Sequence, residues 1–210
     1  PSSIAHAAVT FLKQNPLIQS TLKQVPTSER LESIIMSVKT LSKQPLLMKL
    51  MSCCPIPDLE FEAAFISIRR SILFNINDLS NNQAIVHFQN VLAHQCFINE
   101  YLFIEEEDET ENIKKLERSI REGFQTGRQP STNEILCIAS YKPLNSYEMI
   151  NQITFQTESQ TVIKLQVLDQ EMENRIQSEI PTLRELNNKI SLKVQSQYEK
   201  NPYPRWVMLG

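Results

Sequence analysis

Glycine is almost absent from this chain, where it occupies 3 of 210 positions. It is the residue that reaches positive φ without steric cost, and it supplies most tight turns between β-strands. A chain so poor in glycine lacks both those turns and the glycine-rich loops that cradle phosphate groups. The 11 prolines punctuate helices instead, because proline removes a backbone hydrogen bond and restricts the residue before it. An all-α fold is therefore predicted.

Residues 80–99 contain no Asp, Glu, Lys or Arg, and their apolar side chains spread around much of the helix that they would form. A helix that is apolar on most sides is a buried one. Several amides and two histidines make the run too polar for a membrane span, which needs about 20 apolar residues. We therefore expect a multi-helix bundle or a solenoid-like array packed around a central helix at about residues 80–103.

Helical spacing of apolar residues continues through most of the chain, so about seven to nine helices are expected. Asp58 is a candidate N-cap, and Ser131 opens a capping box. Gly123 or Gly127 can end the helix before that box. Residues 151–159 are ambiguous, because their composition also allows an extended piece. The other predicted helices span about residues 2–13, 17–25, 29–42, 59–73, 113–124, 132–140, 158–180 and 183–198.

Two short segments near the start of the chain resemble each other. Residues 13–18 read Lys-Gln-Asn-Pro-Leu-Ile, and residues 43–48 read Lys-Gln-Pro-Leu-Leu-Met. Their separation of roughly thirty residues is near the period of helical-repeat arrays. Two short copies do not establish a repeat from the sequence alone.

Two charged clusters interrupt the apolar pattern. Arg69 and Arg70 fall off the apolar stripe of their helix, which is typical of a solvated face. Residues 105–111 are acidic at every position except Thr110, and carboxylates before a helix favour the positive end of its dipole. Contiguous carboxylates on a solvated turn do not converge on one ion, so no metal site is predicted there.

The net charge of −3 does not suit nucleic acid or an anionic membrane, and neither is expected as a partner. The cysteines (Cys53, Cys54, Cys96 and Cys137) lack CxxC spacing, and no signal peptide is recognised. Reduced thiols and a cytoplasmic location are therefore expected. The first residue is Pro1, without an initiator Met, which favours a piece excised from a longer polypeptide.

His87 and His94 would lie about 10 Å apart along one helix, and Cys96 would point about 200° away from His94. Metal binding is therefore not expected, and both histidines are interpreted as satisfied core or groove residues. Glu100 lies at the end of the uncharged helix, where burial could raise the pKa of its carboxyl group, and a hydrogen-bonded role in helix packing is the simpler interpretation. His94, Asn99 and Glu100 are the residues of a possible pocket. No sequence motif of a catalytic triad, P-loop or dinucleotide site occurs, and no catalytic residue is assigned.

Residues 195–206 carry a helical run into a Pro-x-Pro segment rich in aromatic and cationic side chains. The two prolines fix φ and favour an extended conformation, so little conformational entropy is lost on docking. The segment is interpreted as a stiff connector, which either packs without a ligand of its own or docks on a fixed surface. The predicted docking residues are Tyr198, Asn201, Tyr203, Arg205 and Trp206.

Five segments of the chain, in order, resemble a known family. They are Pro45-Leu46-Leu47, Pro55-Ile56-Pro57-Asp58, residues 95–103 (QCFINEYLF), Tyr141-Lys142-Pro143-Leu144 and residues 197–206 (QYEKNPYPRW). The series is similar to the helical region that precedes the catalytic domain of bacterial tetratricopeptide-repeat methyltransferases dependent on S-adenosylmethionine. The resemblance covers about residues 44–207.

The resemblance implies a non-catalytic helical module that links or positions substrate-recruiting repeats against a methyltransferase domain. Residues 1–181 would form the helical domain, with residues 1–43 as the tail or cap of a repeat region. Residues 182–210 would form the C-terminal helix and the interdomain connector. The implied partners are the adjacent methyltransferase domain and a protein or peptide substrate. S-adenosylmethionine would bind the parent protein downstream, and this fragment would hold no cofactor.

Two alternatives remain open. One is a helical domain that contributes a substrate pocket to methyl transfer through His94, Asn99 and Glu100, which requires a concave site at these residues. The other is a freestanding helical adaptor that binds a partner peptide in an exposed apolar groove.

Overall fold

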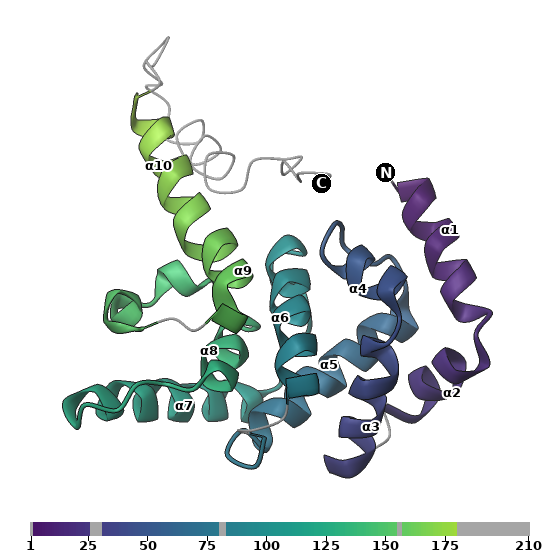
Figure 1. Ribbon diagram of the computed structural model, residues 1–210, viewed down its shortest axis with the longest axis horizontal. Coiled ribbons are helices and arrows are strands. Elements are labelled where there is room, and N and C mark those ends of the chain that lie inside the picture. The colour runs from purple at the N-terminus through teal and green to yellow at the C-terminus, as the bar shows by residue number, and fades with distance from the viewer. Residues whose placement is uncertain (1, 26–30, 80–82, 155–156, 180–210) are drawn as a thin grey trace.

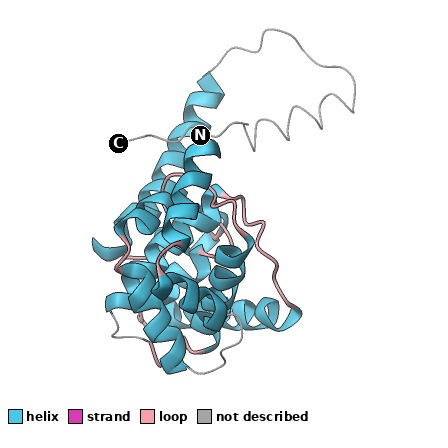
Figure 2. Ribbon diagram, turned by 90° about the vertical axis from the view of Figure 1, so that its right-hand side faces the viewer, coloured by secondary structure: helices cyan, strands magenta, loops and turns pink. Residues whose placement is uncertain are grey.

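The computed structural model describes residues 2–25, 31–79, 83–154 and 157–179. All regular structure in these ranges is helical, which confirms the predicted all-α bundle (Figure 2). The α-helices are α1 (Ser2–Lys13), α2 (Pro16–Gln24), α3 (Leu31–Ser42), α4 (Pro45–Met51), α5 (Leu59–Phe74), α6 (Gln83–Ile98), α7 (Glu107–Gln125), α8 (Thr132–Ala139), α9 (Gln160–Ile163) and α10 (Asp169–Glu179). Short 3-10 turns cover Leu144–Ser146, Glu148–Gln152 and Thr157–Ser159, so the extended piece allowed for residues 151–159 is not seen in the part described.

Helix α6 lies at the centre of the bundle, as the uncharged run predicts. It packs against α3, α4, α5, α8 and α9, and Figure 1 shows it between the N-terminal helices and the α8–α10 side of the molecule. Its buried side chains point to several sides, in agreement with its unusual apolar pattern. They are Ile85, Phe88, Gln89, Leu92, Ala93, Gln95, Cys96 and Phe97.

The predicted continuation of this helix to residue 103 is wrong, because α6 ends at Ile98. Glu100 and Tyr101 have φ of 59° and 57°, in the left-handed region that ends a helix. Tyr101 N donates to Cys96 O over 2.9 Å, which is the long hydrogen bond of a Schellman cap. Glycine is the usual residue at such a cap, so its absence left no sequence signal for this helix end.

A buried amide explains why the central helix is polar but uncharged. Gln95, in the orientation that satisfies both ends of its amide, donates to Met51 O (2.9 Å) and Cys54 O (3.1 Å). It also accepts from Ile56 N over 3.2 Å. Backbone groups of the proline-rich connector between α4 and α5 are thereby satisfied away from water, which an apolar side chain could not do.

Gln166 has the same role on the opposite side of the bundle. It lies in a π-helical turn, Lys164–Leu168, that joins α9 to α10 within the helix predicted for residues 158–180. Its fully buried amide donates to Ala93 O (3.2 Å) and Ala139 O (3.1 Å). It also accepts from Leu144 N over 3.1 Å. One side chain therefore ties this helix to α6, to α8 and to the turn after α8.

The predicted caps are confirmed. Asp58 accepts from Glu60 N and Phe61 N at the start of α5, and Ser131 forms a capping box at the start of α8. At the end of α7, Gly127 has φ of 76° and completes a second Schellman cap, since the next residue donates back to Gly123 O over 2.8 Å. Local side-chain chemistry therefore sets these helix boundaries.

The first four helices form two equivalent pairs. Helices α1 and α3 have 12 residues each, and Pro16 and Pro45 stand in the first turn of α2 and α4. When the two pairs are aligned in sequence so that Pro16 matches Pro45, their buried positions also match. The matched buried pairs are Ala5 with Ile34, Val9 with Val38, Leu12 with Leu41, Ile18 with Leu47, and Leu22 with Met51. The structure therefore contains two copies of a helix–loop–helix unit, and the second extends to residue 51.

We expect Asp58→Ala to lower the free energy of unfolding by about 1 kcal/mol, the typical contribution of an N-cap side chain. Asp58 also pairs with Lys13 over 2.8 Å. Burial pushes the pKa of Asp58 up, but hydrogen bonds from Lys13 and the backbone hold that pKa below its ordinary value. The stabilisation is therefore present above the ordinary carboxyl pKa of about 4 and is lost as the pH falls through the lower folded value.

Urea unfolding at a series of pH values checks this prediction. Asp58→Asn keeps an N-cap acceptor without the charge, so it should lose less stability than Asp58→Ala at pH 7. Equal losses for the two variants would contradict the role assigned to the cap.

Candidate functional site

A buried ion pair joins α5, α7 and the end of α8. The side chains of Arg69 and Glu109 are 3% and 0% exposed, and Arg69 Nη2 lies 3.2 Å from Glu109 Oε1. Tyr141 OH donates to the same carboxylate oxygen over 2.7 Å, and its ring lies 4.3 Å from the guanidinium carbon. Arg69 Nη2 also donates to Ile104 O over 2.7 Å. The other carboxylate oxygen accepts from Glu106 N over 3.1 Å.

The interpretation of Arg69 and Arg70 as one solvated face is wrong for Arg69. Arg70 lies beside it at the surface and pairs with Asp108. The expectation that the acidic run precedes its helix on a solvated turn is also wrong, because α7 begins at Glu107, within the run. Glu109 is buried, since the capping turn of α7 directs this side chain inward. The pairing joins positions 40 residues apart, so the apolar stripe of α5 alone could not reveal it.

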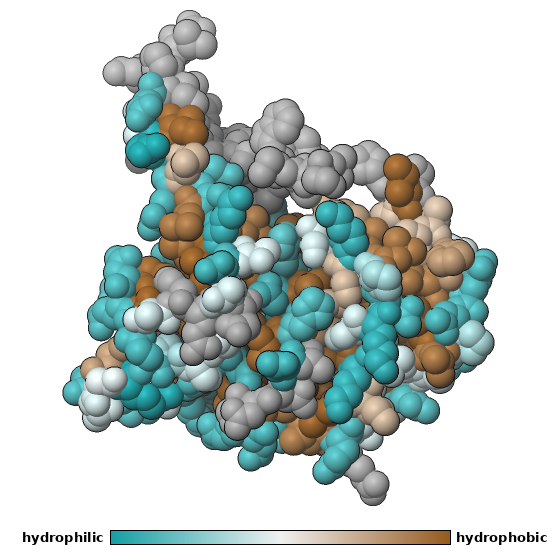
Figure 3. Space-filling model, viewed as in Figure 1, coloured by the Kyte–Doolittle hydropathy of each residue, from teal (hydrophilic) through white to brown (hydrophobic). Residues whose placement is uncertain are grey.

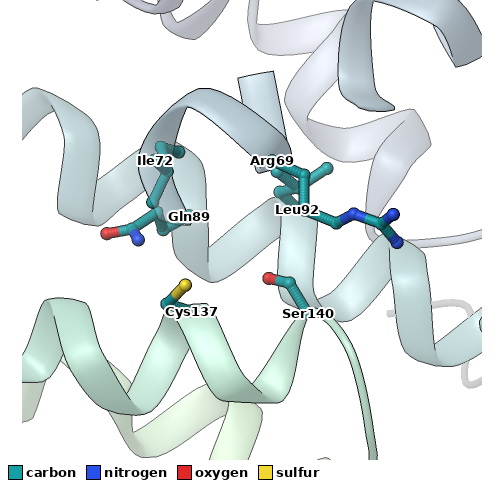
Figure 4. Close-up of a pocket in the computed structure, with 6 residues that line it drawn as sticks. All are labelled: Arg69, Ile72, Gln89, Leu92, Cys137 and Ser140. Atoms are coloured by element: carbon teal, nitrogen blue, oxygen red, sulfur yellow. The ribbon is translucent and has the colours of Figure 1, made fainter. Parts of the chain in front are cut away.

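A small hollow lies beside the ion pair (Figure 4). Arg69 and Ile72 of α5, Gln89 and Leu92 of α6, and Cys137 and Ser140 at the end of α8 line it. It is too narrow to hold a water molecule. Arg69 Nε and Gln89 Oε1 are buried without a hydrogen-bond partner in the part of the chain described. Each buried polar atom without a partner costs about 1–3 kcal/mol of folding free energy. The hollow is therefore a packing defect of a polar core, and its size does not fit a ligand.

Two buried thiols flank this region and are chemically inert at neutral pH. Burial raises the pKa of Cys96 and of Cys137 to about 12, although the positive charge of Arg69 opposes the shift. The thiolate is the nucleophilic form, and its fraction at pH 7 is therefore very small. Neither thiol is suited to covalent catalysis in this state.

The residues of the predicted pocket lie in different environments. His94 is half-buried, and burial lowers its pKa, so it is neutral at pH 7. Asn99 is buried, and its Oδ1 has no hydrogen-bond partner among the described residues. Glu100 is exposed on the left-handed turn. His87, interpreted as a core or groove residue, is exposed on α6.

No family model, curated protein or solved structure matches this chain. Within the described ranges, no group of three or more His, Cys, Asp or Glu side chains could hold a metal ion. No helix in these ranges is long and apolar enough to cross a membrane. The predicted docking residues Tyr198, Asn201, Tyr203, Arg205 and Trp206 lie outside the residues that the structure describes.

Removing one member of the buried ion pair leaves the other charge poorly compensated, although Arg70 Nη1 lies 3.7 Å from Glu109 Oε2. We expect Arg69→Met and Glu109→Gln each to lower the free energy of unfolding by about 3–5 kcal/mol. The double variant should lose clearly less than the sum of the two. Lys142→Met, on the exposed pair with Glu117 (3.3 Å), is the control and should cost less than about 1 kcal/mol. Chemical denaturation measures all four values, and additive losses at Arg69 and Glu109 would contradict the coupling.

The buried thiols should not react with dithionitrobenzoate at pH 8 until the protein unfolds. With a pKa of about 12, the thiolate fraction of Cys96 and Cys137 is about one in ten thousand at that pH. Cys53 and Cys54 are half-buried and account for the reaction of the native protein. Replacing both by Ser should abolish it. Rapid modification of more than two thiols in the native protein would contradict the burial.

Proposed function

We propose that this chain is a non-catalytic helical module of a multidomain methyltransferase dependent on S-adenosylmethionine. It positions substrate-recruiting helical repeats on one side against a catalytic domain on the other. Residues 201–206 (NPYPRW) form the joint to that domain, with Tyr203, Arg205 and Trp206 on the docking surface. The resemblance of residues 44–207 to this family supports a bacterial origin, and the reduced thiols expected from the cysteine spacing support a cytoplasmic location of the parent protein.

The proposal rests on the resemblance of residues 44–207 to this family, and the structural observation that supports its non-catalytic part is the use made of buried polar side chains. Gln95 and Gln166 bind backbone groups of neighbouring helices and connectors, and Glu109 is shared between Arg69 and Tyr141. Polar groups that bond to one another and to the backbone hold helices in fixed positions, although a few buried polar atoms, such as Arg69 Nε, have no partner among the described residues. A rigid spacer requires this property, whereas an active site keeps convergent polar groups open toward a pocket.

The two helix–loop–helix units support the link to a repeat region. Residues 2–24 and 31–51 repeat the same buried positions, which is the behaviour of stacked helical repeats. The step from Pro16 to Pro45 is shorter than a tetratricopeptide repeat, which has about 34 residues. We therefore propose that they are atypical terminal units of such a region.

The alternative with a substrate pocket has one observation in its favour. Asn99 Oδ1 is buried without a partner among the described residues, close in sequence to the neutral His94. A polar ligand could satisfy this atom. The exposed position of Glu100 argues against a site that contains all three residues.

Calorimetry with S-adenosylmethionine tests the proposal. The full-length parent protein should bind the cofactor, and residues 1–210 alone should give no binding heat. Binding by this chain alone would overturn the non-catalytic role. Absence of binding by the parent protein would overturn the methyltransferase assignment. Asn99→Ala addresses the pocket, because a loss of parent turnover without a loss of stability would favour the alternative.

A further inference from the structure

Helix α10, together with Leu168 at the end of the π-helical turn before it, carries an apolar stripe that no described part of the bundle covers. Leu168, Met172 and Ile176 are 56%, 54% and 50% exposed and follow one another at intervals of four residues. Four residues are about one helical turn, so the three side chains lie on one face. Figure 1 shows α10 projecting from the bundle, and Figure 3 shows hydrophobic surface along the projection.

A projecting helix of this kind needs a partner. Helix α10 has 11 residues, and isolated helices of that length are marginal in water. Most helical stability comes from packing of an amphipathic face. None of the α10 side chains that the structure describes is buried. The apolar face of the helix is therefore the place where a stabilising contact would form.

The sequence after α10 contains a second stripe that mirrors the first about Pro181. Its members are Leu186, Ile190 and Val194. Leu186 lies as far after Pro181 as Ile176 lies before it, and the same holds for Ile190 with Met172 and for Val194 with Leu168. In an antiparallel helix pair, positions at equal distances from the turn face each other. A proline at the turn suits a short loop between two antiparallel helices.

The charges of the two segments are also complementary. Residues 169–179 contain four acidic residues and one arginine, which gives 1 − 4 = −3. Residues 182–200 contain four basic and two acidic residues, which gives 4 − 2 = +2. A second copy of α10 would bring two negative segments together. The attraction therefore favours the following segment over a self-associated helix as the occupant of the stripe.

We propose that residues 182–198 fold back as a helix on the Leu168–Met172–Ile176 face of α10. The hairpin returns the chain toward the start of α9, because Asn201 lies as far after Pro181 as Thr161 lies before it. This inference is independent of the methyltransferase assignment.

Cysteine crosslinking of the full chain tests the fold-back, in a background with Cys53 and Cys54 replaced by Ser. Met172→Cys with Ile190→Cys should close an intramolecular disulfide on mild oxidation. Met172→Cys with Asn188→Cys is the matched control, since position 188 lies about 200° around the helix from position 190. The control should close at least about tenfold more slowly, because disulfides require Cα atoms within about 7 Å.

Three outcomes would overturn the proposal. These are equal rates for both cysteine pairs, absence of a disulfide in both, or a product crosslinked between two chains, which would assign the stripe to a second copy.

Tryptic cleavage after Lys189 and Lys193 gives an independent measurement. Met172→Glu places a charge on the stripe and should accelerate this cleavage severalfold. Asn174→Glu, exposed on another face, should leave the cleavage rate unchanged. Equal acceleration by both variants would also count against the hairpin.

Discussion

The ion pair between Arg69 and Glu109 is the interaction on which the arrangement of α5, α7 and α8 depends. Removing two charges from water costs several kcal/mol per ion, and an apolar pair of the same size often replaces such a bridge without loss. Here the carboxylate accepts from the guanidinium, from Tyr141 OH and from Glu106 N, while the guanidinium rests on the tyrosine ring. These directional contacts fix the helices in one register, since sliding α7 along α5 would leave two charges buried and unpaired.

Buried amides extend the same principle to the connections between helices. Gln95 and Gln166 each bind two carbonyl oxygens and one N–H group of segments that are not part of their own helix. Asn133 adds a bond of 2.7 Å to Leu79 O. A chain with few glycines has few tight turns, and its connections follow irregular paths with unpaired backbone groups. Side-chain amides satisfy those groups, so the core is held by directional bonds as well as by apolar packing.

The sequence was a good guide wherever the deciding chemistry is local. Asp58, Ser131 and Gly127 marked helix ends correctly, because caps involve residues within one turn. It failed where distant residues decide, as for the burial of Arg69 and Glu109. The end of α6 was missed for another reason, since Glu100 and Tyr101 adopt left-handed φ without glycine. The repeat was only suggested by two proline segments, and the buried positions of four helices were needed to establish it.

The π-helical turn at Lys164–Leu168 has a consequence for how one helix serves two neighbours. A π turn takes in about one residue more than an α turn, which displaces every later side chain by about 100° around the axis. Before the turn, Val162 and Ile163 are buried in the bundle, and within it Gln166 is buried too. After it, the apolar side chains of α10 have a different azimuth. One extra residue thus divides a continuous helix into two parts. The first part is buried in the bundle, and the second directs its apolar side chains elsewhere, so the two faces can be adjusted separately during evolution.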